Sequence, residues 1–209
     1  IPKLGMGLGI AALTAVVIFG GIRQIARVAE VVVPFMAGAY LLLAIIVLAM
    51  NITAVPGVLG DIVASAFGFG PAAGGVAGSV AAAMLNGVKR GLFSNEAGIG
   101  SAPIAHAAAK TRRPASEGIV ALLEPMLDTV VICTITALVL CVTMKFDGTT
   151  GNYIINGQSY VLGTAGAGTQ DGIAMTSAAF ETIHSSFKYI LFFCVFAFAF
   201  STLITWSYY

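Results

Sequence analysis

Charged residues are scarce in this sequence. Lysine, arginine, aspartate and glutamate make up 9% of its 209 residues, whereas a soluble globular domain has about 25%. Hydrophobic residues reach 58%, and the mean hydropathy is +0.97. The formal net charge is only +1, which offers no basic surface for nucleic acid. We therefore expect a membrane protein rather than a soluble enzyme or a nucleic-acid-binding domain.

Residues that carry chemistry are also few. The three cysteines, Cys133, Cys141 and Cys194, are an odd number and lie in apolar stretches. We interpret them as small buried hydrophobic residues rather than disulfides or metal ligands. The sequence has no nucleophile elbow, no phosphate-binding loop and no zinc-ligand spacing. We expect neither an enzyme nor a bound structural metal.

Five apolar segments predict an all-α membrane protein. The candidate crossings are residues 7–22, 28–50, 72–109 (broken near 91–100), 116–144 and 189–209. A crossing helix needs about 20 apolar residues, so the first is short. We expect a short amphipathic helix over residues 58–67 to lie on the membrane surface. Because the sequence lacks a starting methionine and stops inside an apolar run, we interpret residues 1–209 as one transmembrane domain fragment of a longer protein.

Residues 145–188 form a long glycine-containing connection between the last two crossings. Asn156-Gly157 separates two short β-like runs, which predicts a hairpin. Residues 174–187 predict a helix. Its Glu181 and His184 share one face, but two residues make an incomplete metal site, so a solvated face is the favoured interpretation.

The distribution of lysine and arginine predicts the orientation, since cytoplasmic loops carry more of both. With five crossings, one side receives Arg23, Arg27, Lys110, Arg112 and Arg113. The other side receives Lys3, Lys145 and Lys188. We therefore expect a multi-pass protein of the cell membrane, with Lys110 to Arg113 in the cytoplasm and residues 145–188 outside.

The third crossing contains polar residues among glycines. Lys89, Arg90, Asn95 and Glu96 lie at membrane depth, where charges normally line a pathway or a site. We predict that helical geometry is lost within residues 91–94, which would free backbone groups for a ligand. Ser94 and Asn95 can then bind a cation or a polar substrate. Alternatively, they only cap a kink.

The charges of this segment need partners. Glu124 and Asp128 lie on one face of the fourth crossing. An ion pair with Arg90 is the favoured interpretation, because an unpaired charge in lipid is costly. A proton relay and a sodium-binding carboxylate are the alternatives. Together Lys89, Arg90, Glu96, Glu124 and Asp128 form the expected buried charge network, in which Glu96 folds back on Arg90 or on backbone amides.

Hydroxyl groups stand on the fifth crossing. Ser201 and Thr202 offer hard oxygen ligands for a small cation, and Trp206, on the face of Thr202, can wall a small pocket. From the residues alone we favour hydroxyls bonded to their own helix and an interfacial aromatic ring. His106 lies in an alanine run, and we interpret it as a packed residue rather than a switch.

Three motifs carry a resemblance to a known family. They are GLFSNEAGIGSAPIAHAAAKT at residues 91–111, EPMLD at residues 124–128 and STLITWSYY at residues 201–209. Together they resemble the alanine/glycine:cation symporter family, the sodium:alanine symporters. The likeness extends over essentially the whole chain.

The resemblance implies a fold similar to that of the bacterial leucine transporter, with two inverted repeats of five helices. This chain would hold the last helices of the first repeat and the first three of the second. Residues 91–96 would be the unwound part of the broken helix. The fifth crossing would supply hydroxyls to sodium, which favours Ser201 and Thr202 as ligands. The opening broken helix of the first repeat is not in the sequence.

The resulting expectation is part of a secondary active transporter that imports alanine or glycine with Na⁺ by alternating access. Phe93, Ser94, Asn95 and Trp206 would bind substrate. The expected partners are the amino acid, Na⁺, the lipid bilayer and the remaining helices of the longer protein. The rival is an ion channel or pore subunit with Glu96 and Asp128 in a charged ring. A structural scaffold would leave the intramembrane charges unexplained.

Overall fold

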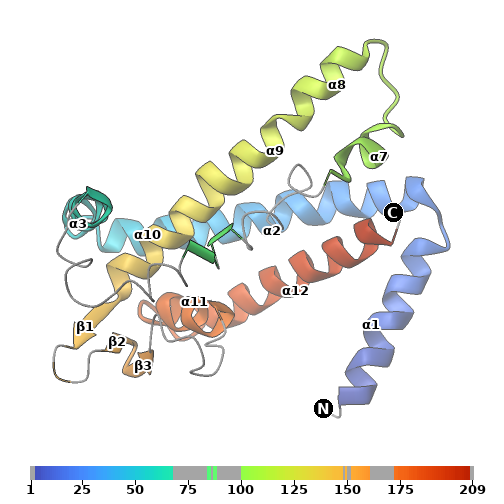
Figure 1. Cartoon of the computed structure of the whole chain (residues 1–209). Helices are drawn as coiled ribbons and strands as arrows, with labels where there is room; N and C mark the ends of the chain where they lie inside the picture. The colour runs from blue at the N-terminus through green and yellow to red at the C-terminus, as the bar shows by residue number, and fades with distance from the viewer. Residues whose placement is uncertain are drawn as a thin grey trace. The chain divides into compact units, whose positions relative to one another are not determined.

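The computed structural model describes residues 3–67, 84–85, 87–88, 100–147, 149, 152–160 and 172–207. They are mostly helical, with one small sheet (Figure 1). Three helices are long and apolar enough to cross a membrane: Gly21–Met50, Pro114–Thr143 and Phe187–Trp206. Two further apolar helices, Gly7–Ile18 and Val55–Ala64, are shorter. The described residues thus support the predicted all-α membrane class. The expected third crossing lies largely outside them.

The chain divides into two units. The first consists of Ile1–Leu42 and Tyr189–Tyr209, and the second of Leu43–Lys188. Helix α2 contributes residues to both. Each unit has its own packing, so each is described by itself.

In the first unit a glycine pair separates the first two helices. Helix α1 spans Lys3–Ile18 and α2 spans Ile22–Met50. Gly21 has a φ of +70°, a conformation that costs a side chain about 1–2 kcal/mol, and its N–H donates to the Ile18 carbonyl at 2.8 Å. The predicted end of the first helix at residue 22 is therefore wrong, because the chain turns at Gly20-Gly21.

Helix α2 begins at Ile22, not at residue 28 as predicted. Arg23 and Arg27 lie inside its first turns. The predicted start marked the beginning of the apolar run, but arginine is a good helix former and the helix continues through it. Pro34 also lies inside α2.

Helix α12, Phe187–Trp206, packs against α2 in the opposite direction. Near one end of the pair the rings of Phe35 and Phe193 meet edge to face, with centroids 6.4 Å apart. Near the other end lies a cluster of Val17, Ile25 and Ile204, with Val28 and Phe200 packed against it. Ile25 of α2 lies near Ile204 of α12, and Phe35, further along α2, meets Phe193, earlier in α12. The two helices are therefore antiparallel. Trp206 therefore lies at the Arg23 end of this unit.

In the second unit a single long helix runs from Pro114 to Thr143. It consists of α8 (Pro114–Ala121), α9 (Leu123–Pro125), the π-helix η1 (Met126–Cys133) and α10 (Thr134–Thr143). The short helix α7, Ala102–His106, precedes it and contacts α8. Helix α3, Val55–Phe67, contacts α10. A helix of this length spans about 45 Å, more than the hydrocarbon core of a bilayer.

The connection between the last two crossings contains an antiparallel sheet of β1 (Lys145–Asp147), β2 (Asn152–Ile155) and β3 (Gln158–Tyr160). The predicted hairpin at Asn156-Gly157 is confirmed. Both residues have positive φ, 48° and 74°, as a two-residue type I′ turn requires. Helix α11, Gly172–Glu181, contacts α10 and β2 and ends six residues before the predicted residue 187.

Polar side chains around this connection are paired locally. Tyr160 is buried, and its hydroxyl donates to Gln158 Oε1 at 2.7 Å. Burial raises the pKa of the Tyr160 phenol, which keeps it protonated and able to donate. Glu181 accepts a hydrogen bond from Lys188 Nζ at 2.8 Å, and His184 Nδ1 accepts from the Ser186 N–H. Within the described part of the chain no cluster of three or more metal-ligating side chains occurs.

Cysteine burial follows the prediction only in part. Cys194 on α12 is buried and Cys141 is half-buried, but Cys133 is exposed, and all three are free thiols. The interpretation of Cys133 as a buried residue is therefore wrong for this chain. An exposed position on an apolar helix suits a thiol, which behaves as a small hydrophobic group.

The turn at residues 156–157 gives a test of the hairpin. In the complete protein, Gly157→Ala should reduce stability by about 1 kcal/mol or more, because alanine is strained at positive φ. Gly172→Ala is the control, because Gly172 lies in α11 and a Cβ there meets nothing within 4 Å. Thermal unfolding in detergent and hydrogen exchange over residues 152–160 would measure the difference. Equal stability of the two variants would contradict the turn assignment.

Candidate functional site

The hydroxyls predicted to bind a cation lie near the C-terminal end of α12. Ser201 Oγ and Thr202 Oγ1 each donate a hydrogen bond to the carbonyl oxygen of Phe198, both at 2.9 Å. The structure therefore shows the bonding to the helix's own backbone that the residues alone favoured. It also brings the two hydroxyl oxygens together around one carbonyl.

This arrangement has a chemical consequence. A hydroxyl has one proton and two acceptor lone pairs. Since both protons are used inside the helix, the lone pairs of Ser201 and Thr202 remain as acceptors. Hard cations are bound by such oxygen atoms. A hydroxyl bonded to its own helix is therefore also a suitable cation ligand, and the two interpretations are compatible.

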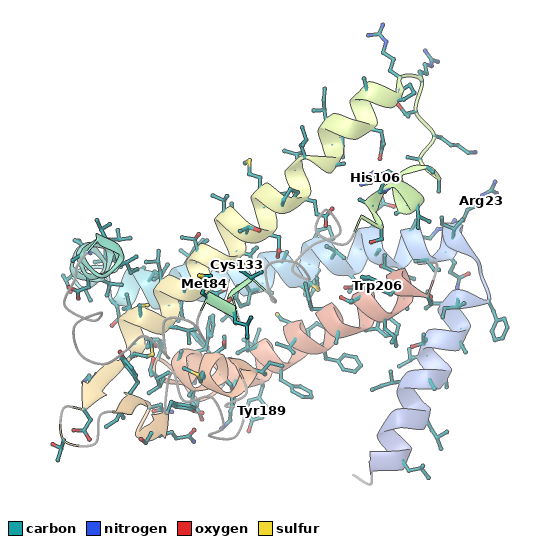
Figure 2. All side chains as sticks on the ribbon, viewed as in Figure 1. Arg23, Met84, His106, Cys133, Tyr189 and Trp206 are labelled. Atoms are coloured by element: carbon teal, nitrogen blue, oxygen red, sulfur yellow. The ribbon has the colours of Figure 1, made fainter. Side chains whose placement is uncertain are left out.

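The two hydroxyls stand on different faces of α12. The buried side of the helix carries Leu191, Cys194, Ala197, Ser201 and Ile204. Ser201 thus belongs to the packed side, with 7% of its surface exposed. Thr202 is exposed, and Trp206, one turn further along, is 43% exposed. Figure 2 shows Trp206 at the end of α12. Thr202 and Trp206 therefore share the open side of this helix.

The acidic residues of the predicted charge network lie on the long helix of the second unit. Glu124 is in α9, Asp128 is in the first turn of η1, and both are half-buried. Pro125, between them, has no N–H for the α-helical bond to Ala121, and the helix continues beyond it in the wider π register. π-Helical segments occur frequently at functional sites. The sequence analysis noted this proline but did not predict the π-helix.

The rest of the predicted site lies outside the described residues. This applies to Phe93, Ser94, Asn95, Lys89, Arg90 and Glu96, and to the predicted break within residues 91–94. Just after this segment, Gly100 has a φ of +83° and α7 begins at Ala102.

One pair of side chains was missed by the sequence analysis. His106, at the end of α7, places Nδ1 2.6 Å from Oε1 of Glu117 in α8. The two side chains are 30% and 25% exposed, so the interpretation of His106 as a packed residue is incomplete. Eleven residues separate the two, and no local periodicity connects them. The available signal was a histidine before a basic loop and a glutamate in the first helical turn after Pro114.

The pair borders a hollow of about 550 Å³ between α7 and α8. Its other lining side chains are small or apolar, including Ala102, Pro103 and Gly118. His106 and Glu117 are the only titratable residues among those that line it.

Because Ser201 and Thr202 lie on different faces of α12, replacing each with leucine should change stability by different amounts. Ser201→Leu adds volume on the packed side and should destabilise the complete protein by about 1–3 kcal/mol. Thr202→Leu adds volume on the open side and should change stability by about 0.5 kcal/mol or less. Thermal unfolding in detergent would compare them. A greater loss for Thr202→Leu would show that Thr202 lies on the packed side.

The whole chain, residues 1–209, matches the sodium:alanine symporter family. It is 40% identical over 211 residues to the sodium/alanine symporter AgcS of Methanococcus maripaludis, covering 100% of this chain and 42% of the relative. It is 39% identical to the sodium/proton-dependent alanine carrier protein of Bacillus sp. PS3, covering 100% of this chain and 45% of the relative. An uncharacterized transporter of Haemophilus influenzae is 43% identical, over 78% of this chain and 34% of the relative.

The chain spans less than half the length of these relatives. No solved structure was found to match it. Because the family match covers every residue and the identities approach or exceed 40%, the chain belongs to the sodium:alanine symporter family, a family of transporters and not of enzymes.

Proposed function

We propose that the complete protein carries alanine or glycine into the cell together with Na⁺ by alternating access. Family membership supports sodium-coupled symport of an amino acid, and two relatives bear names that specify alanine carriage with sodium. In this mechanism sodium favours one conformation, and its inward gradient drives the substrate with it.

The observation that carries the proposal is the oxygen cluster on α12. Ser201 Oγ and Thr202 Oγ1 both lie 2.9 Å from the Phe198 carbonyl oxygen. Both protons are donated to the helix's own backbone, so the oxygen lone pairs remain available as acceptors. A hydroxyl oriented in this way needs little rearrangement when sodium arrives. Ser201 and Thr202 are therefore the proposed sodium ligands, and other elements complete the coordination.

The proposed substrate-binding residues come from the predicted broken segment and from α12. Phe93, Ser94 and Asn95 would contribute polar groups and one wall. Trp206, on the open side of α12 with Thr202, is the fourth proposed substrate-binding residue. The charge network of Lys89, Arg90, Glu96, Glu124 and Asp128 would hold the surrounding helices in register.

The proposed orientation in the membrane is supported by the positions of the basic residues along the helices. Arg23 and Arg27 begin α2, and the antiparallel packing places Trp206 at their end of the unit. The proposed cytoplasmic side therefore includes the C-terminal end of α12. In the second unit, Arg112 and Arg113 precede the long helix and Lys145 follows it. This charge distribution supports the proposal that the hairpin and α11 lie outside a cell membrane.

The rival function, an ion channel or pore subunit, makes a different prediction. A symporter reconstituted in proteoliposomes should show saturable, sodium-dependent counterflow of labelled alanine or glycine. A channel should show ohmic current without an amino acid. The experiment uses the full-length protein, and ohmic current with no counterflow would reject the proposed function.

The sodium ligand gives a specific test. Thr202→Ala should lower amino-acid affinity mainly at low Na⁺, and a high Na⁺ concentration should restore that affinity, because the binding of the two ligands is reciprocal. Stability should change by about 1 kcal/mol or less, since the substitution removes one hydrogen bond and leaves little cavity. Uptake measured over a series of Na⁺ concentrations would show the shift.

Thr143→Ala is the matched control. Thr143 also donates to a carbonyl of its own helix, at 2.8 Å from Val139 O, but it lies at the far end of α10, next to the external sheet. Its substitution should leave the sodium dependence unchanged. If Thr202→Ala kept the sodium dependence of the unsubstituted protein, Thr202 would have only the backbone-bonding role.

A further inference from the structure

Helices α7 and α8 are joined by an ordered loop. The Ala109 N–H donates to the His106 carbonyl at 3.0 Å. Further along, Ser116 Oγ donates to the Arg113 carbonyl at 2.6 Å, and the Thr111 and Ser116 hydroxyls are 3.1 Å apart. These bonds are local in the loop. Among the hydrogen bonds of the described residues, the side-chain bond between His106 and Glu117 joins α7 directly to α8. Figure 2 labels His106 on α7.

This bond joins two titratable groups in a short contact. At 2.6 Å between Nδ1 and Oε1, it is slightly shorter than the roughly 2.7–2.9 Å of charge-assisted N–H···O bonds. Histidine is the side chain that changes charge most readily between about pH 5 and 8. Because both side chains are partly exposed, they can exchange protons with water. The strength of the α7–α8 connection can therefore respond to pH.

Among the residues of α7, α8 and the loop between them, no described contact competes with the pair. Glu117 is the only charged residue of α8, and α7 contributes no ionisable side chain other than His106. The loop between them carries Lys110, Arg112 and Arg113, all of them exposed. The Glu117 carboxylate is in direct contact with the His106 imidazole, with Oε1 2.6 Å from Nδ1.

We propose that His106 and Glu117 form a proton-binding site that controls the contact between α7 and α8. In the deprotonated state, neutral His106 donates its Nδ1 proton to the Glu117 carboxylate. A proton taken from water binds Nε2, and the pair becomes imidazolium and carboxylate with no other bond broken. The second state attracts more strongly, so acidification holds α7 against α8.

The site regulates transport, and this part of the inference depends on the proposed function. Helix α7 begins at Ala102, close in sequence to Ser94 and Asn95, and the proposal is that a restraint on α7 is passed along the chain to these residues. Alternating access requires such elements to move. A tighter contact slows this movement. Uptake therefore decreases as the cytoplasmic side becomes acidic, while the regulating proton remains on the protein and is not carried with the substrate.

A distance measurement tests the site without using transport. Spin labels would be placed on Ile104→Cys in α7 and Ile119→Cys in α8, both exposed positions, in the full-length protein with its native cysteines replaced. The distance distribution should be shorter and narrower at about pH 6 than at about pH 8. With His106→Gln, the amide remains neutral, so the distribution should stay at its high-pH form at both values.

The control is His184→Gln. His184 accepts a backbone N–H and has no carboxylate contact among the described interactions, so its replacement should leave the pH response intact. The exchanged variant His106→Glu with Glu117→His rebuilds the pair in reverse and should restore the response. An unsubstituted protein with the same distances at both pH values, or a pH shift that persists in His106→Gln, would overturn the proposal.

Uptake provides the second readout. At a fixed Na⁺ gradient and equal pH on both sides, uptake by the unsubstituted protein should be about fivefold slower at pH 6 than at pH 8. His106→Gln should remove most of this difference, and the exchanged variant should restore it. A full pH response in His106→Gln would reject the regulatory role. Absence of any sodium-dependent uptake would reject the proposed function instead, and the spin-label result would still decide the site.

Discussion

The constraint on which this structure depends is the absence of water inside a membrane. A polar group in hydrocarbon must find its hydrogen-bond partner within the protein. The described helices meet this constraint with hydroxyls that bond to carbonyls of their own turn, as Thr14, Thr136 and Thr205 do. No buried side-chain nitrogen or oxygen in the described residues lacks a partner. Polar residues can therefore stand on apolar helices without breaking them.

Proline shows how the same constraint shapes the long helix of the second unit. Pro125 cannot donate a backbone hydrogen bond, and in water the chain could turn at this point. In a membrane the backbone has to remain bonded, so the helix continues in the π register from Met126 to Cys133. Glu124 and Asp128 flank the change of register. The position of these carboxylates is thus set by the proline as well as by their spacing in the sequence.

Features that depend on local sequence could largely be predicted. Features that depend on contacts between distant residues could not. The Asn156-Gly157 hairpin is confirmed because both turn residues tolerate positive φ without help from the rest of the chain. The ends of the first two helices were wrong, because hydropathy marks the apolar stretch and not the hydrogen-bonded helix that extends through Arg23 and Arg27. The π-helix depends on how a proline is accommodated, which periodicity does not reveal.

The candidate site divides in the same way. Ser201 and Thr202 could be identified from their residue type and a family motif, yet their different burial depends on tertiary packing around α12, which residue type does not reveal. The contact of His106 with Glu117 depends on the path of the loop between them, so neither residue alone predicts it. The role of residues 93–96 remains a prediction from the sequence.

The two kinds of polar group described here suit different tasks. The Ser201 and Thr202 hydroxyls bond within one helix, so their positions follow α12 and change little when the rest of the protein moves. As the proposed sodium ligands, they would bind the ion with little reorganisation, which would preserve affinity. The His106–Glu117 bond instead joins two elements, so any change in its strength alters their relative freedom. Rigid ligands and adjustable connections are both needed in a transporter, because an ion must be held firmly in a site whose access changes. The Ser201 and Thr202 hydroxyls lie on an uninterrupted helix, and the His106–Glu117 bond lies beside the loop that joins α7 to α8.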